Sequence, residues 1–85
     1  MSAALRTFGG RAQTDVCIEE MAELAVALEH KRRGRGSHEA VIEEIADVMI
    51  MAGQMALLYG EDAVHEVWER KLLRLDRRIK EAKEK

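Results

Sequence analysis

Apolar residues recur at the three- and four-residue spacing of an α-helix along three stretches of the chain. The first stretch predicts a helix that begins at a Thr14 or Asp15 cap and ends near Arg33. Its apolar positions are Cys17, Met21, Leu24, Ala25 and Leu28. Residues 1–13 show little periodicity, so we expect a partly mobile start before this helix.

The second stretch is apolar around almost its whole circumference. Ser37 has the side chain of an N-cap and Gly60 ends the pattern, so a helix is predicted between them. From 45 to 58 the only strongly polar side chains are Asp47 and Gln54, which is typical of a buried helix. Two companion helices of one subunit can hardly surround such a helix. We therefore expect copies of the chain to assemble.

The third stretch begins near Glu61 or Asp62 and continues to a frayed tail over residues 80–85. Its apolar residues, alternately four and three positions apart, form a seam like that of a coiled coil. They are Trp68, Leu72, Leu75, Ile79 and Ala82. The predicted fold is all-α: a single domain over 1–85, a short helical bundle of about three main helices, completed by homo-oligomerisation to a dimer or tetramer.

Composition supports this fold and reduces the number of partner classes to consider. The 85 residues are 47% hydrophobic and 35% charged, with no proline, and a chain this short holds one small domain. The single cysteine and the lack of a leader pattern indicate a cytoplasmic protein with no membrane span. Residues 70–85 carry 8 Lys/Arg against 3 Asp/Glu, but the net charge of -2 makes nucleic acid an unlikely partner.

Two pairs of carboxylates are the main candidates for chemistry. Glu20 and Glu23 on the first helix, and Glu44 and Asp47 on the second, are three residues apart, so each pair projects from one side of its helix. The short loop between the helices can bring the pairs together. Glu44 and Asp47 share a face with apolar residues, where an unpaired ionised carboxylate is costly. We therefore expect a positive group there.

Oxygen ligands without cysteine or histidine favour Mg²⁺, with Mn²⁺ possible, over zinc. Mg²⁺ keeps several waters and is commonly completed by substrate phosphates, so the pattern suggests phosphate chemistry. The alternative is that the acids form ordinary surface salt bridges. For Glu20 and Glu23 alone we favour that alternative, and for both pairs together we favour the metal site.

The two pairs form the pattern Glu-x-x-Glu, a spacer, then Glu-x-x-Asp. This pattern resembles the one that defines the MazG-like all-α nucleoside triphosphate pyrophosphohydrolases. This superfamily includes dimeric dUTPases and phosphoribosyl-ATP pyrophosphatases. The two halves lie within 19–24 and 43–48, and the resemblance covers about residues 8–79. It extends to Phe8, Gly9, Gln13 and Lys71.

The resemblance implies an activity and a set of ligands. The reaction would be attack of a metal-activated water on the α-phosphorus of a (d)NTP substrate, giving (d)NMP and pyrophosphate, as in nucleotide-pool housecleaning. The implied Mg²⁺ ligands are Glu20, Glu23, Glu44 and Asp47. A nearby carboxylate can take the proton of the water, and the choice between Glu19 and Glu20 stays open.

Basic residues of the third helix are the candidates for phosphate binding. The resemblance assigns this role to Lys71. Arg74 and Arg78 lie on the same helix side, where they can neutralise charge on the leaving pyrophosphate. For Arg78 a solvated basic face is an equal alternative.

Two other functions stay open: an enzyme like phosphoribosyl-ATP pyrophosphatase, and a non-enzymatic helical oligomerisation module. Several nucleotide-selective members use an asparagine near the lysine-bearing helix, and this chain has no asparagine. The sequence therefore leaves the base preference undetermined.

Overall fold

The computed structural model describes residues 2–84, which form four α-helices and no strand. The helices are α1 (Ser2–Phe8), α2 (Gly10–Arg32), α3 (His38–Tyr59) and α4 (Glu61–Glu84). The all-α prediction is confirmed. Over the same residues, no helix combines the length and the apolar character needed to cross a membrane.

The start of the chain differs from the prediction. Residues before Thr14 are helical, and α2 begins at Gly10 with Gly9 as its N-cap residue. Thr14 does not cap the helix, since its hydroxyl donates to the Gly10 carbonyl oxygen at 2.7 Å. Gly9 adopts φ 90°, a conformation that glycine reaches without strain, so the break between the helices falls there. The expected mobility of residues 1–13 stays a prediction, and residue 1 lies outside the described residues.

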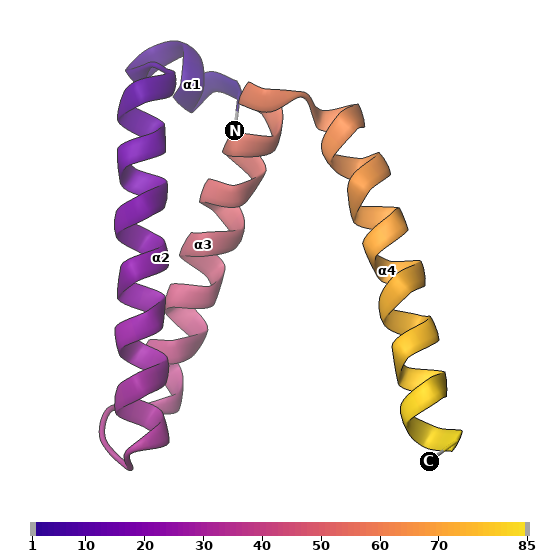
Figure 1. Ribbon diagram of the computed structural model, residues 1–85. Coiled ribbons are helices and arrows are strands. Elements are labelled where there is room, and N and C mark those ends of the chain that lie inside the picture. Colours follow the sequence, from indigo (N-terminus) through magenta and orange to yellow (C-terminus); the bar gives the residue numbers. More distant parts are fainter. Residues whose placement is uncertain (1, 85) are drawn as a thin grey trace.

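Helices α2 and α3 pack side by side as an antiparallel hairpin, with α1 across its open end (Figure 1). The buried core is small and lies towards that end: its hydrophobic members are Cys17 and Met51, and its polar members are Gln13 and Gln54. Gly10 permits close packing there, because a Cβ atom at this position would lie 3.1 Å from Leu58 Cδ1.

The predicted boundaries at the other end of the hairpin are confirmed. The Ser37 hydroxyl accepts a hydrogen bond from the Ala40 amide at 3.1 Å, so it caps α3 as expected. Arg32 forms an ion pair with Glu29 at 2.6 Å in the last turn of α2. These local contacts fix the reversal of the chain between α2 and α3.

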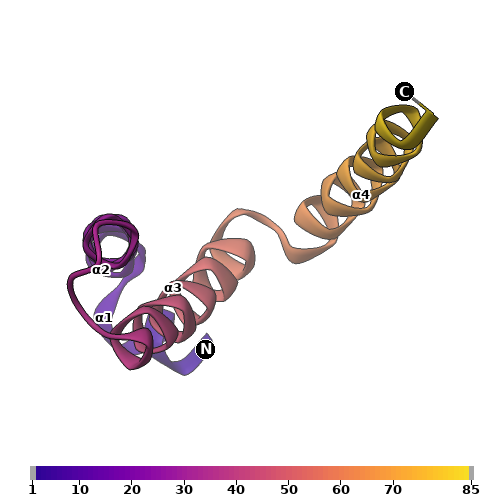
Figure 2. The same ribbon diagram turned by 90° about the horizontal axis from the view of Figure 1, so that it is seen from below.

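Helix α4 leaves the hairpin. Gly60, with φ 116°, ends α3, and α4 then runs away from both hairpin helices (Figures 1 and 2). Of the other helices it contacts only α3, and all of its residues are exposed. The three long helices therefore do not close into a bundle within one copy of the chain. Helical periodicity predicted the apolar seam of α4 but carries no information on which surface covers it. The predicted fraying of 80–85 stays untested: α4 continues to Glu84, and Lys85 lies outside the described residues.

Candidate metal centre

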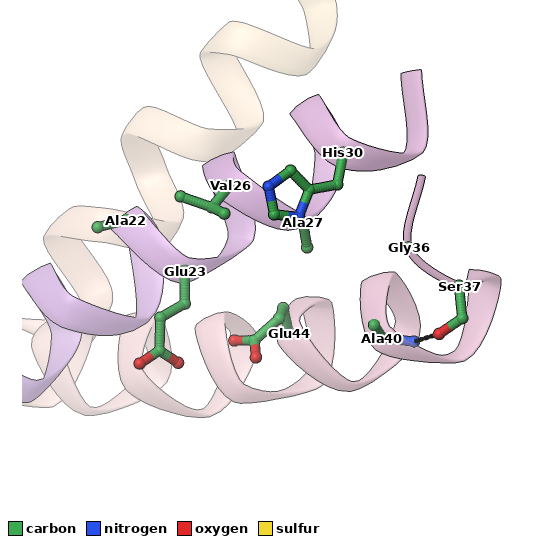
Figure 3. A pocket seen from close by; sticks show the side chains of 9 residues that line it. All are labelled: Ala22, Glu23, Val26, Ala27, His30, Gly36, Ser37, Ala40 and Glu44. Carbon is green, nitrogen blue, oxygen red and sulfur yellow. Dashed lines mark hydrogen bonds between the residues drawn. The ribbon is translucent and has the colours of Figure 1, made fainter. Parts of the chain in front are cut away.

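The antiparallel packing of α2 and α3 brings three predicted carboxylates together. Glu20, Glu23 and Glu44 each offer an oxygen, and these oxygens lie within 4.8 Å of one another. Glu20 and Glu44 are half-buried, whereas Glu23 is exposed. Figure 3 shows the Glu23 and Glu44 side chains in the space between the two helices. The group contains neither cysteine nor histidine, so its donor set is hard oxygen.

Asp47 and Glu19 lie outside that group of three. Asp47 is nevertheless close enough for its charge to raise the pKa of both Glu20 and Glu44. Glu19 is exposed, and the structure does not bring it into the group of oxygens. Of the two candidates for the general base, only Glu20 therefore lies in the cluster.

The cluster lacks a compensating positive charge. Burial raises the pKa of Glu20, and the neighbouring charges of Glu23, Asp47 and Glu44 raise it further. Burial is also the largest cause of the raised pKa of Glu44, followed by the charges of Glu23 and Asp47. Within residues 2–84, none of these four carboxylates forms an ion pair with a lysine, arginine or histidine. Ordinary salt bridges thus do not account for them here.

The residues fit a divalent cation. One oxygen of Glu20 and one of Glu44, the Oε2 atom in each case, are buried without a hydrogen-bond partner in the described structure. A buried carboxylate oxygen without a partner is destabilising. Carboxylate oxygens from two packed helices are suitable ligands for Mg²⁺ or Mn²⁺, and such an ion would offset the mutual repulsion of the acids.

A cavity of about 390 Å³ adjoins the cluster at the loop end of the hairpin. Glu23 and Glu44 lie on one side of it, and His30 and Ser37 lie towards the loop (Figure 3). Gly36 and four small apolar side chains complete the lining: Ala22, Val26, Ala27 and Ala40. Sequence reasoning missed this cavity. Its signal was the set of small side chains at Ala22, Val26 and Ala27 on α2, which line the cavity together with Ala40 on α3.

The predicted basic residues lie elsewhere. Lys71, Arg74 and Arg78 line a shallow depression of about 240 Å³ on α4, beside Leu75. Because α4 diverges from the hairpin after Gly60, the structure does not bring them to the carboxylates of the same chain. None of the three forms an ion pair or a side-chain hydrogen bond in the part of the chain that is described. Acids and bases are therefore both present without partners, in separate regions.

Comparisons with family models, curated proteins and solved structures find no match for this chain.

Proposed function

We propose that the protein is an Mg²⁺-dependent nucleoside triphosphate pyrophosphohydrolase, which converts a (d)NTP and water to a (d)NMP and pyrophosphate. One observation carries the proposal: acids from Glu-x-x-Glu on α2 and Glu-x-x-Asp on α3 converge in a cluster with two buried, unpartnered oxygens. A cation shared with a polyphosphate would satisfy such a cluster.

The residues of the hairpin would hold the cation. Glu20, Glu23 and Glu44 supply the closest oxygens, with Asp47 beside them. A bound Mg²⁺ or Mn²⁺ would offer positive charge to the phosphates and lower the pKa of a coordinated water. Glu20, which lies in the cluster, suits the role of proton acceptor better than Glu19 outside it.

Lys71, Arg74 and Arg78 would bind the phosphates. Their guanidinium and ammonium groups have no acidic partner in the described chain, so they are available for an anion. They would stabilise negative charge that develops on the leaving pyrophosphate. This role requires α4 to lie against a hairpin, which the single chain does not provide.

A homo-oligomer, either a dimer or a tetramer, is part of the proposal. Cys17 and Met51 are the only buried hydrophobic residues among those described, and large apolar side chains of α2, α3 and α4 are exposed. A monomer with so little buried apolar area would be marginally stable. Nucleotide chemistry and a buried free thiol fit a cytoplasmic location.

The cavity beside the cluster would receive the nucleoside. Its apolar lining suits the faces of a base, and its position places the phosphates of such a ligand next to Glu23 and Glu44. The base itself is not specified, because His30 and Ser37 offer polar groups that several bases can use.

Product analysis tests the function. The protein is incubated with Mg²⁺ and canonical or modified NTPs, dNTPs and phosphoribosyl-ATP, and monophosphate and pyrophosphate are quantified together. Equal amounts of both, lost on chelation, are expected. A preference for phosphoribosyl-ATP would move the assignment to that enzyme class. Orthophosphate alone, or no turnover, would overturn the proposal in favour of an oligomerisation module.

A further inference from the structure

The loop end of the hairpin is strongly basic, and the proposed function gives it no role. Residues 29–38 carry 4 Lys/Arg against a single acid, Glu29. The basic residues are Lys31, Arg32, Arg33 and Arg35, and all of them are exposed. A positive surface of this kind raises the local concentration of anions.

Local contacts satisfy the acid but not all of the bases. Both carboxylate oxygens of Glu29 accept hydrogen bonds from Arg32 Nη2, at 2.6 and 2.9 Å. Arg33 reaches the same carboxylate only through Nε, at 3.6 Å. Arg35 forms neither an ion pair nor a side-chain hydrogen bond within residues 2–84. The guanidinium group of Arg35 and the Nη groups of Arg33 are therefore available to a ligand.

The backbone of the loop holds Arg35 in a defined turn. The Arg35 amide donates to the His30 carbonyl oxygen at 2.7 Å, and the Gly34 amide donates to that of Lys31 at 3.1 Å. These two bonds form a Schellman motif, which places Gly34 in the left-handed region at φ 78°. A Cβ atom at Gly36 would lie 3.4 Å from His30 Cβ, so the loop turns back against α2. Such preorganisation lowers the entropic cost of binding.

The two available arginines line a cavity of about 350 Å³. The rest of its lining is Ala25, Val26, Glu29 and His30. This cavity shares Val26 and His30 with the cavity beside the carboxylate cluster, so the two adjoin. Figure 3 shows these two side chains on α2. The space admits a phosphate or a pyrophosphate, and the His30 imidazole adds a further hydrogen-bond donor.

We propose that Arg33, Arg35 and His30 form a phosphate-binding site at the loop end of the hairpin, separate from the candidate metal centre. The planar fork of a guanidinium group matches two oxygens of a phosphate. The phosphate group belongs either to free phosphate or pyrophosphate, or to a nucleotide that lies in the adjoining cavity and carries a second phosphate. The site itself stands on the loop alone, and only its use by a nucleotide rests on the proposed function.

Titration of metal-free protein with pyrophosphate tests the site without any turnover. The ionised carboxylates then repel the anion, which disfavours binding at the cluster. NMR of the arginine side chains locates the anion, and calorimetry measures its Kd. Shifts of the Arg33 and Arg35 guanidinium resonances are expected, and Arg35→Gln should weaken binding by about 10-fold. Arg77→Gln removes the same charge from an exposed position of α4 and should bind like wild type.

Three results would overturn the loop site. The first is no binding of pyrophosphate, or resonance shifts confined to Arg74 and Arg78 of α4. The second is equal weakening in Arg35→Gln and Arg77→Gln, which would show attraction to the net charge alone. The third comes from a single-stranded oligonucleotide titrated in parallel. If the loop binds the oligonucleotide but not pyrophosphate, it is a nucleic-acid surface.

Comparison of AMP with adenosine 3′,5′-bisphosphate identifies the source of the phosphate. If a nucleotide supplies it, the bisphosphate should bind about 10-fold more tightly than AMP, and Arg35→Gln should remove that gain. Ala27→Leu fills the nucleoside cavity, so it should weaken both nucleotides and leave pyrophosphate binding unchanged. Equal affinity for AMP and the bisphosphate assigns the site to free phosphate or pyrophosphate. These binding results hold whether or not the protein hydrolyses nucleotides.

Discussion

The hairpin and α4 are both built from long helices, yet they differ in what satisfies their side chains. The hairpin buries Cys17 and Met51 against neighbours and gathers acids that repel one another. Helix α4 buries nothing and carries bases beside an apolar stripe. The difference teaches that neither region is complete alone: one lacks positive charge, and the other lacks a surface to pack on.

The largest expected effect comes from removing an acid of the hairpin. Glu44→Gln keeps the size of the side chain but removes a charged ligand, so turnover should fall on the order of 100-fold or more. Glu43→Gln, at the exposed neighbouring position, is the matched control and should retain activity. Steady-state assays at saturating Mg²⁺ make the comparison. Equal activity of the two variants would remove the cluster from the reaction.

A charge in the apolar stripe of α4, which is formed by Val64, Trp68, Leu72, Leu75 and Ile79, should disrupt assembly. Leu75→Glu places a carboxylate in a surface that we propose is covered, which should weaken association by about 10-fold or more. Leu73→Glu is the control, because Leu73 is 68% exposed and lies off the stripe. Sedimentation equilibrium measures both. If the two variants associate equally well, the stripe is not an interface.

Filling the cavity should affect nucleotide binding more than the cation site. Ala27→Leu reduces the space beside Glu23 and should raise KM for nucleotides by about 10-fold. Exposed Ala12 on the same helix gives the control, Ala12→Leu. Binding of Mn²⁺, followed by electron paramagnetic resonance, should be unchanged in both. An unchanged KM in Ala27→Leu would place the nucleoside elsewhere.

The smallest expected effect is a change of protein stability with pH. In metal-free protein the raised pKa values of Glu20 and Glu44 mean that the folded state binds protons more tightly than the unfolded state. Stability should therefore fall as pH rises from the usual value of 4.5 through the raised values.

Thermal melts from acid to neutral pH measure this trend. Mg²⁺ should restore the lost stability at neutral pH, since it binds the ionised form. Glu44→Gln should weaken the pH dependence, whereas Glu43→Gln should leave it intact. A metal-free melting temperature that rises steadily across the same range would contradict the electrostatic account of the cluster.

Sequence predicted most of the helices and the cluster, because both depend on local spacing. Ser37 and Gly60 mark helix ends through their own side chain or backbone. Glu20, Glu23 and Glu44 meet because a short loop forces α2 and α3 to be neighbours. The helix before Thr14 was missed because its apolar residues have little periodicity.

The position of α4 could not be predicted in the same way. An apolar seam that includes Leu72 and Leu75 can pack equally well on a helix of the same chain or of another chain. The backbone conformation at Gly60 decides the direction in which α4 runs. The cavity near Ala27 was missed because small side chains on neighbouring helices leave a space only when the two helices are placed together.

Hydrolysis in water enriched in oxygen-18 tests the central claim most directly, because it reports which phosphorus is attacked. With a preferred triphosphate and Mg²⁺, attack at the α-phosphorus places one label in the monophosphate and none in pyrophosphate, which is the result the account predicts. Label in pyrophosphate or in orthophosphate, or no product at all, would contradict it.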